Sequence, residues 1–340
     1  MTRPHLFMLI ASMLVAACGE REQAADVVDP GADVNPEPIV VYASYENEAY
    51  LPKMFEGFTE DTGIRVTVRH AEQQKNVDDV IAKRGSPPAD VLLTSSLIGV
   101  WRAADKGALR PLGSDAINQS VSEFMRDPDG FWTAISLRPV QIAFDTQQFA
   151  QSEIGEIEDL ANPEFKGKLC LTSSARAVNR SMIAKLIQSH GERPAEIIVR
   201  GWVSNLALPS FSSEAELMRA MAAGTCAVGI VSFSELRRSV ANEGAERIGA
   251  KAIVPVHGSV EAAGINRHAR EPEAARLLLE WMLSRQVHVD HVTRIVASPV
   301  IVEAYEDEAS IAEFVGGKHL GAALWLDEDA VKLAERAAYR

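Results

Sequence analysis

The residues KLCLTSSARAVNRS, positions 168–181, begin with a short apolar strand pattern and end in the first turn of a helix pattern that continues to residue 190. Between the two patterns lie hydroxyl groups and one guanidinium: Thr172, Ser173, Ser174 and Arg176. A turn from strand to helix leaves backbone N–H groups without intrahelical partners, and serine or threonine there can cap the helix or donate to a ligand. The stretch therefore predicts either an anion-binding turn or an ordinary serine N-cap, and its residues alone leave both readings open.

Strand and helix patterns also alternate along the rest of the chain. Apolar and β-branched runs predict strands at 38–44, 64–68, 89–93, 169–171, 226–232 and 262–265. Amphipathic periodicity predicts helices at 49–62, 77–84, 177–190, 215–223, 272–283 and 327–338. This alternation predicts an α/β fold with a largely parallel sheet, in which ligands lie beyond the carboxyl ends of the strands. Three expected strand tips are polar: residues 44–45, 94–96 and 172–174.

The run FWTAISLRPVQIAF, residues 131–144, predicts two strand segments that break at Arg138 and Pro139. Proline inside a strand pattern indicates an edge or a crossover, because it cannot donate to the sheet. We therefore expect a domain boundary at this point. A length of 340 residues with 47% hydrophobic residues is sufficient for two domains with their own cores.

The formal net charge of −13 argues against nucleic acid as a partner and against an anionic membrane surface, because both require a basic face. The sequence contains no Gly-x-Ser-x-Gly elbow, no glycine-rich phosphate loop and no HExxH motif, so we predict neither an enzyme nor a cofactor. His288, Asp290 and His291 have a spacing that could suit a metal, but we interpret them as a solvated helix segment.

The first 17 residues carry Arg3, then an apolar run that is too short to span a bilayer, and they predict a secretory signal peptide. The sequence VAAC, ending at Cys18, resembles a bacterial lipobox, in which this cysteine is lipidated. Residues 20–38 are acidic and rich in alanine and proline, which predicts a flexible tether over 18–38. Cys170 and Cys226 then remain as candidates for one disulfide in an exported protein.

Short pieces of sequence occur in an order that is characteristic of one protein family. They are VYASY (41–45), FTEDTGIRV (58–66), PADVLLT (88–94), Trp132 with Arg138, NPEFKGKLC (162–170), Asn179 with Ser181, AAGTCAVGI (222–230), HG (257–258) and SPV (298–300). Together they resemble the periplasmic ferric-iron-binding proteins, a branch of the solute-binding proteins that serve ABC importers. The resemblance covers essentially the whole mature chain.

The resemblance implies the two-lobe fold of a type II-like periplasmic binding protein, each lobe a mostly parallel sheet flanked by helices, with the ligand cleft between the lobes. We expect the N-terminal lobe at 39–137 plus 258–305 and the C-terminal lobe at 138–257 plus 306–340. The family also has cysteines at the two strands that hold Cys170 and Cys226, which supports their pairing. The implied partners of this monomer are an ABC permease and its ATPase, and the implied location is the periplasm.

The sequence departs from the family at the metal site. Relatives that bind ferric iron have adjacent tyrosines where this chain has Ser232 to Glu235, and many have an acidic residue at the position of Ser95. Phenolate oxygens suit a hard trivalent cation, so their loss favours another ligand. The expected ligand-binding residues are Tyr45, Ser95, Arg138, Ser173, Ser174, Asn179, Ser234 and Glu235.

Three of these residues have alternative interpretations. Arg138 could form a salt bridge at the hinge instead of binding an anion, Glu235 could complement a helix dipole, and Tyr45 could be a rim residue. The leading hypothesis is a lipid-anchored solute-binding protein for a small polar, anionic ligand. The alternatives are ferric iron or another metal held by Tyr45, Glu46, Glu235 and a synergistic anion, and a ligand-sensing module for a signalling partner.

Overall fold

The computed structural model describes residues 37–44, 50–83, 88–242, 244–295, 297–304 and 324–340. The expected signal peptide, Cys18 and nearly all of the expected tether lie outside the described residues, as do Tyr45 and Glu46. No helix in the described part of the chain is long and apolar enough to cross a membrane.

The strands join in one sheet with the order β2-β1-β3-β9-β5-β7-β6, while β4 pairs with β9 and β8 pairs with β5. Their bounds are β1 (Ile39–Ala43), β2 (Val66–His70), β3 (Val91–Thr94), β4 (Leu109–Arg110), β5 (Thr133–Asp145), β6 (Leu169–Cys170), β7 (Val228–Ser232), β8 (Ile248–Ala252) and β9 (Gly258–Asn266). Pairing is parallel within β2-β1-β3 and between β6 and β7. Every pairing of β5 and β9 is antiparallel, so the sheet is mixed and not mostly parallel.

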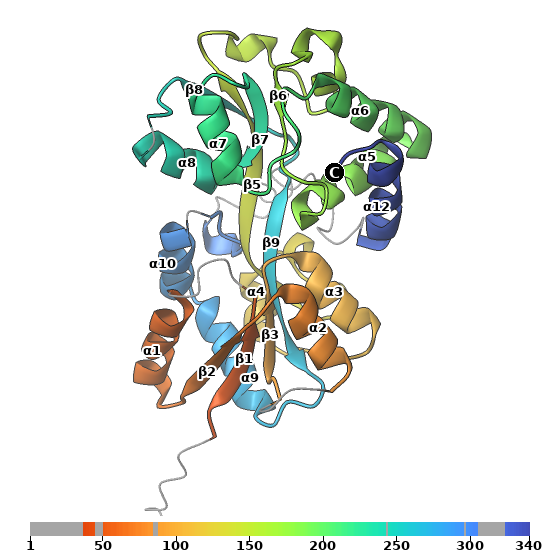
Figure 1. The fold of residues 1–340 in the computed structure, drawn as a ribbon. Coiled ribbons are helices and arrows are strands. Elements are labelled where there is room, and N and C mark those ends of the chain that lie inside the picture. Colours follow the sequence, from red (N-terminus) through yellow and green to blue (C-terminus); the bar gives the residue numbers. More distant parts are fainter. Residues whose placement is uncertain (1–36, 45–49, 84–87, 243, 296, 305–323) are drawn as a thin grey trace, which may run out of the picture. The chain divides into compact units, whose positions relative to one another are not determined.

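Helices cover the parts of this sheet that lie on either side of the antiparallel ladder between β5 and β9 (Figure 1). The α-helices are α1 (Tyr50–Thr62), α2 (Gln73–Ile81), α3 (Leu97–Asp105), α4 (Asp115–Ser120), α5 (Ala177–His190), α6 (Glu192–Asn205), α7 (Glu214–Ala222), α8 (Phe233–Asn242), α9 (Pro272–Met282), α10 (Arg285–Ile295) and α12 (Asp327–Arg336). The 3-10 helices are η1 (Glu123–Met125), η2 (Gln151–Glu153), η3 (Asp159–Ala161), η4 (Pro163–Phe165), η5 (Val302–Ala304) and η6 (Leu324–Leu326).

The strand β5 is continuous through Pro139, which corrects the expected break at Arg138 and Pro139. Up to Pro139, β5 pairs with β9, and from Val140 onward it pairs with β7 and β8. The proline is tolerated because backbone hydrogen bonding continues at the next residue. The Val140 N–H donates to the His257 carbonyl at 2.8 Å. The proline in the sequence therefore marks the point where β5 changes its partner strands, and not the end of a strand.

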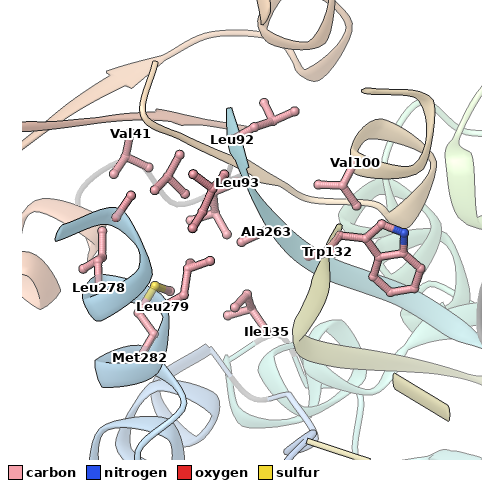
Figure 2. Packing of buried hydrophobic residues seen from close by; sticks show 14 of the residues in the cluster. Val41, Leu92, Leu93, Val100, Trp132, Ile135, Ala263, Leu278, Leu279 and Met282 are labelled. Atoms are coloured by element: carbon pink, nitrogen blue, oxygen red, sulfur yellow. The ribbon is translucent and has the colours of Figure 1, made fainter. Parts of the chain in front are cut away.

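Two groups of elements bury separate apolar cores. One core joins β1 and β3 to the apolar faces of α1 and α9, and Figure 2 shows Val41 and Leu93 on the face of the sheet toward Leu278 and Met282. The second group buries one core between β6, β7 and the helices α5, α6 and α12, and another core between the same strands and the helices α7 and α8. A two-lobe α/β fold, as expected, follows from these two groups of elements and the strands that connect them.

The helix α10 differs from its predicted environment. His288 and His291 were expected on a solvated helix segment, yet their exposed fractions are 0% and 1%. The His288 ring accepts a hydrogen bond from the Val300 N–H at 3.0 Å, which ties α10 to the following loop. The helical period and the polarity of these residues gave the wrong prediction, because a neutral imidazole can be buried in an apolar core.

Gly258 permits the close approach of β5 and β9. A Cβ atom at this position would lie 2.1 Å from the carbonyl oxygen of Arg138, which belongs to rigid backbone. We predict that Gly258→Ala lowers the free energy of unfolding by about 2 kcal/mol, because the two strands must separate to admit the methyl group. Urea denaturation measures this loss.

Gly57 in α1 provides a matched control, because its added Cβ would meet only the Trp281 ring at 3.5 Å. Gly57→Ala should raise the free energy of unfolding by up to about 0.8 kcal/mol through helix propensity. Equal effects of the two substitutions would show that the crossing does not require a glycine.

Candidate ligand-binding cleft

A cleft of about 1000 Å³ lies beside the antiparallel ladder of β5 and β9, which we call the β5–β9 crossing. Residues from both groups of elements form its walls. From the first group come residues of α2, the β3 tip and α3: Gln73, Gln74, Val77, Ser95, Ser96, Ile98, Gly99, Trp101, Arg102 and Lys106. From the second come residues of the turns before α5, α7, α8 and α12, including Arg176, Arg180, Ser213, Glu214, Ser232, Ser234, Glu235, Arg238, Trp325 and Asp327.

Helix N-termini converge on this cleft. The first turns of α3, α5, α7 and α8 all contribute lining residues, among them Ile98, Ala177, Glu214 and Ser234. The N-terminus of a helix carries a partial positive charge and N–H groups that lack intrahelical acceptors. Several such ends around one cavity favour a ligand with negative charge.

The turn of residues 168–181 lies in the wall of the cleft, although not in the way its sequence indicates. The Asn179 side-chain amide donates to the carbonyls of Thr172 and Ser173 at 3.1 and 2.8 Å, which holds the turn closed. The Ser174 hydroxyl donates to the Tyr339 carbonyl at 2.9 Å, and the Ser173 hydroxyl accepts from the Ala175 N–H at 3.2 Å. None of the three hydroxyl- and amide-bearing residues lines the described cleft.

Arg176 and Arg180 face the cleft from this turn instead. Arg176 is the N-cap residue of α5 and its side chain makes no cap hydrogen bond, so the expected serine N-cap is wrong. The Arg180 guanidinium pairs with Asp327 at 2.9 Å, which joins α5 to the start of α12. The disulfide Cys170–Cys226, expected from the sequence, is present. It links the end of β6 to the loop directly before β7.

The floor of the cleft contains an ion pair across the two long strands. Arg138 on β5 contacts Glu261 on β9 with 2.6 Å between Nη2 and Oε1, and Glu261 also accepts from the Ser136 hydroxyl. The Glu261 side chain is 1% exposed and that of Arg138 is 17% exposed. Arg138 forms the salt bridge that is one of its two interpretations, and it also lines the cleft.

The tip of β7 forms a second polar wall. The Glu214 carboxylate accepts from the Ser232 N–H at 3.1 Å and from the Ser232 hydroxyl. Glu235 accepts from Arg238 and, at 3.3 Å, from Ser239. Ser234 lies within 3.2 Å of the Ser232 hydroxyl. Glu235 is therefore engaged within its own helix, in agreement with its alternative role near the α8 N-terminus.

Gln73 organises the opposite wall. Its side-chain oxygen accepts from the Ser96 N–H at 3.0 Å and the Ser95 hydroxyl at 3.2 Å, while its amide donates to the Ser96 hydroxyl at 2.7 Å. Of the expected ligand residues, Ser95, Arg138, Ser234 and Glu235 line the cleft. Gln73, Glu214 and Arg180 were missed because no motif distinguishes them from other surface positions.

Within the described ranges, no group of three or more histidine, cysteine, aspartate or glutamate side chains could hold a metal ion. The described part of the cleft combines guanidinium groups, carboxylates, hydroxyls and helix N-termini. Its chemistry suits hydrogen bonding to a polar solute.

Comparison with known proteins identifies relatives of the same architecture. The family model for bacterial extracellular solute-binding proteins matches residues 86–313. The Iron uptake protein A1 of Synechocystis sp. is 26% identical over 325 residues, which cover 90% of this chain and 88% of that protein. The Fe(3+)-binding periplasmic protein of Serratia marcescens is 22% identical over 285 residues, or 82% and 80% of the two chains.

A solved structure of a Trichodesmium protein in complex with iron and citrate has the same fold. It superposes with a TM-score of 0.79 at 26% identity and covers 89% of this chain and 100% of that one. Similarity over nearly the whole length of both chains confirms the two-lobe periplasmic-binding-protein fold.

The Arg138–Glu261 pair generates a stability prediction. Arg138→Met leaves a buried carboxylate without its guanidinium, and we expect the free energy of unfolding to fall by about 3 kcal/mol. The double variant Arg138→Met/Glu261→Gln removes the orphaned charge and should recover most of this loss. Urea denaturation of both single variants and the double variant completes the cycle, and additive effects would contradict coupling between the two residues.

The buried histidines generate a pH prediction. Burial, reinforced by His291, lowers the pKa of His288 to about 4, below the ordinary value of 6.5. Below pH 6.5 the His288 side chain therefore binds a proton in the unfolded chain but not in the native chain. The free energy of unfolding falls for this reason as the pH drops from 6.5 toward 4. Between pH 6.5 and pH 5 we expect His288 alone to cost about 2 kcal/mol.

Urea denaturation at pH 7 and pH 5 measures the effect. His288→Gln retains a side-chain acceptor for the Val300 N–H and should show a shallower loss of stability on acidification than the unmodified protein. The same difference in His288→Gln as in the unmodified protein would refute the assignment.

Proposed function

Since the chain belongs to the family of bacterial extracellular solute-binding proteins, we propose that it captures a small polar, anionic solute in this cleft for an ABC importer. The observation that carries the proposal is that the first turns of six helices, α2, α3, α5, α7, α8 and α12, line one cleft that also contains Arg138 and Arg176. A guanidinium offers a planar fork of donors to carboxylate or phosphate oxygens. The positive ends of helices add charge stabilisation, which the acidic first-turn residues Glu214 and Glu235 offset in part.

The proposed mode of action is closure of two lobes about the β5–β9 crossing. We place the lobes at 39–137 plus 258–305 and at 138–257 plus 306–340. The change of partner of β5 after Pro139 supports a boundary there, because each half of the strand belongs to a different ladder. A ligand that contacts both walls stabilises the closed arrangement by its differential affinity.

The proposed location is the periplasmic side of a bacterial membrane, where a monomer with a lipid on Cys18 presents its ligand to a permease and ATPase. This part of the proposal depends on the sequence of residues 1–38 and on the family, whose members include the periplasmic Serratia marcescens relative. A ligand-sensing role with a signalling partner would use the same cleft and the same closure.

A second candidate is ferric iron held together with an anion. The observation that favours it is the nature of the relatives, which are named for iron uptake or ferric iron binding, and the Trichodesmium complex, which contains iron and citrate. Glu235 and Glu214 are the carboxylates of the β7 wall, and Tyr45 and Glu46 are the further expected ligands. A guanidinium such as Arg138 would then hold the accompanying anion.

Thermal unfolding of the purified protein with a panel of carboxylates, phosphate esters and phosphonates tests the leading proposal. A ligand at about 100 times its dissociation constant contributes about 2.7 kcal/mol and should raise the midpoint by roughly 5 °C. Arg176→Gln should weaken binding of the same anion about tenfold, while Arg200→Gln on α6, outside the cleft, should not.

No rise with any anion would refute the proposed function. A coloured complex with one equivalent of ferric iron, formed in the absence of these organic anions, would establish the second candidate in its place. Metal analysis of protein purified without chelators distinguishes the two.

A further inference from the structure

Two tryptophans line the cleft from opposite walls. Trp101 is a half-buried residue of α3, and Trp325 belongs to η6, directly before α12. The Trp325 side chain is 65% exposed although it lies in a concave surface. An indole ring in such a position presents a large apolar face to whatever enters the cleft.

The other tryptophans lie outside the cleft. Trp132 and Trp202 are buried, with exposed fractions of 2% and 1%. The Trp281 indole donates to Asp61 at 2.7 Å and contacts Phe58 edge-on. Trp101 and Trp325 thus differ from the rest in that both belong to the ligand-facing surface.

Apolar side chains continue the surface around the two indoles. Val77 and Ile98 lie on the Trp101 wall, and Leu324 and Val140 lie on the other side. A cleft of about 1000 Å³ is at the upper end of the range for sites of organic molecules, and it is far larger than one small inorganic anion needs. The cleft therefore offers both apolar faces and directed polar groups.

Positive groups lie beside the exposed indole. Arg180 pairs with Asp327, two residues after Trp325, so the guanidinium and the ring belong to the same wall. Arg176, the N-cap residue of α5, lies four residues before Arg180, and Arg138 lies on the floor of the cleft. A ligand that contacts Trp325 with a ring can place a carboxylate toward these guanidinium groups.

We infer that the ligand is an organic anion built on an aromatic ring, held with its ring against Trp325 and Trp101 and its carboxylate toward the arginines. The inference rests on the proposed anion-binding function and narrows its ligand class. Aromatic rings pack favourably on indoles in offset or edge-on geometry, which aliphatic carboxylates cannot reproduce.

Calorimetric titration of the full chain with phthalate and protocatechuate, against succinate and citrate, tests this inference. We expect at least one aromatic acid to bind about tenfold more tightly than either aliphatic acid. Trp325→Ala and Trp101→Ala should each weaken its binding about tenfold and leave aliphatic acids unaffected. Trp281→Phe is the matched control, because that indole lies outside the cleft, and should leave every affinity unchanged.

Tryptophan emission gives an independent measurement. Covering the exposed indole should shift the emission to shorter wavelength when the aromatic acid binds, and Trp325→Phe, but not Trp281→Phe, should abolish most of this shift. Equal binding of aromatic and aliphatic acids, or a shift that survives Trp325→Phe, would overturn the inference and leave the anion-binding function intact. Binding of none of the four acids would also overturn it, whereas failure of the wider anion panel would refute the proposed function itself.

Discussion

The antiparallel ladder between β5 and β9 is the constraint on which the rest of this structure depends. In this ladder Gly258 lies opposite Pro139, and each strand continues beyond it into a different set of partners. The apolar cores form on either side of this ladder. The cleft lies over it, so its floor is built from the same residues that connect the cores.

The features of the fold that could be predicted from the sequence are those that a local pattern or the family resemblance specifies. The helix Ala177–His190 and the disulfide Cys170–Cys226 were predicted because a local period and a residual pair of cysteines, supported by the family resemblance, specify them directly. The continuity of β5 through Pro139 could not be predicted, because it depends on a partner strand more than one hundred residues away. Burial of His288 likewise depends on Val300, which the helical pattern does not contain.

The residues of the candidate site were harder to predict than the secondary structure. Ser173, Ser174 and Asn179 have the side chains that an anion site needs, yet the described contacts use them to hold their own turn and to fasten the C-terminal segment. Tyr339 donates to the Thr172 carbonyl at 2.6 Å from a buried position, so the turn is fixed by residues at the far end of the chain. A polar residue at a strand tip is equally suited to either task, and only the tertiary fold decides which hydrogen bonds it forms.

The charges of the cleft decide what kind of recognition it can perform. Arg138, Arg180 and Arg238 already contact Glu261, Asp327 and Glu235, so an incoming anion would share guanidinium donors with a carboxylate of the protein. A guanidinium has five N–H donors and can serve both partners, but the net attraction at long range is small. The chain also carries a net charge of −13, whose repulsion is screened beyond about 8 Å at physiological salt. Affinity must therefore come from short-range contacts with directed donors and apolar faces, which select a ligand by shape and not by charge alone.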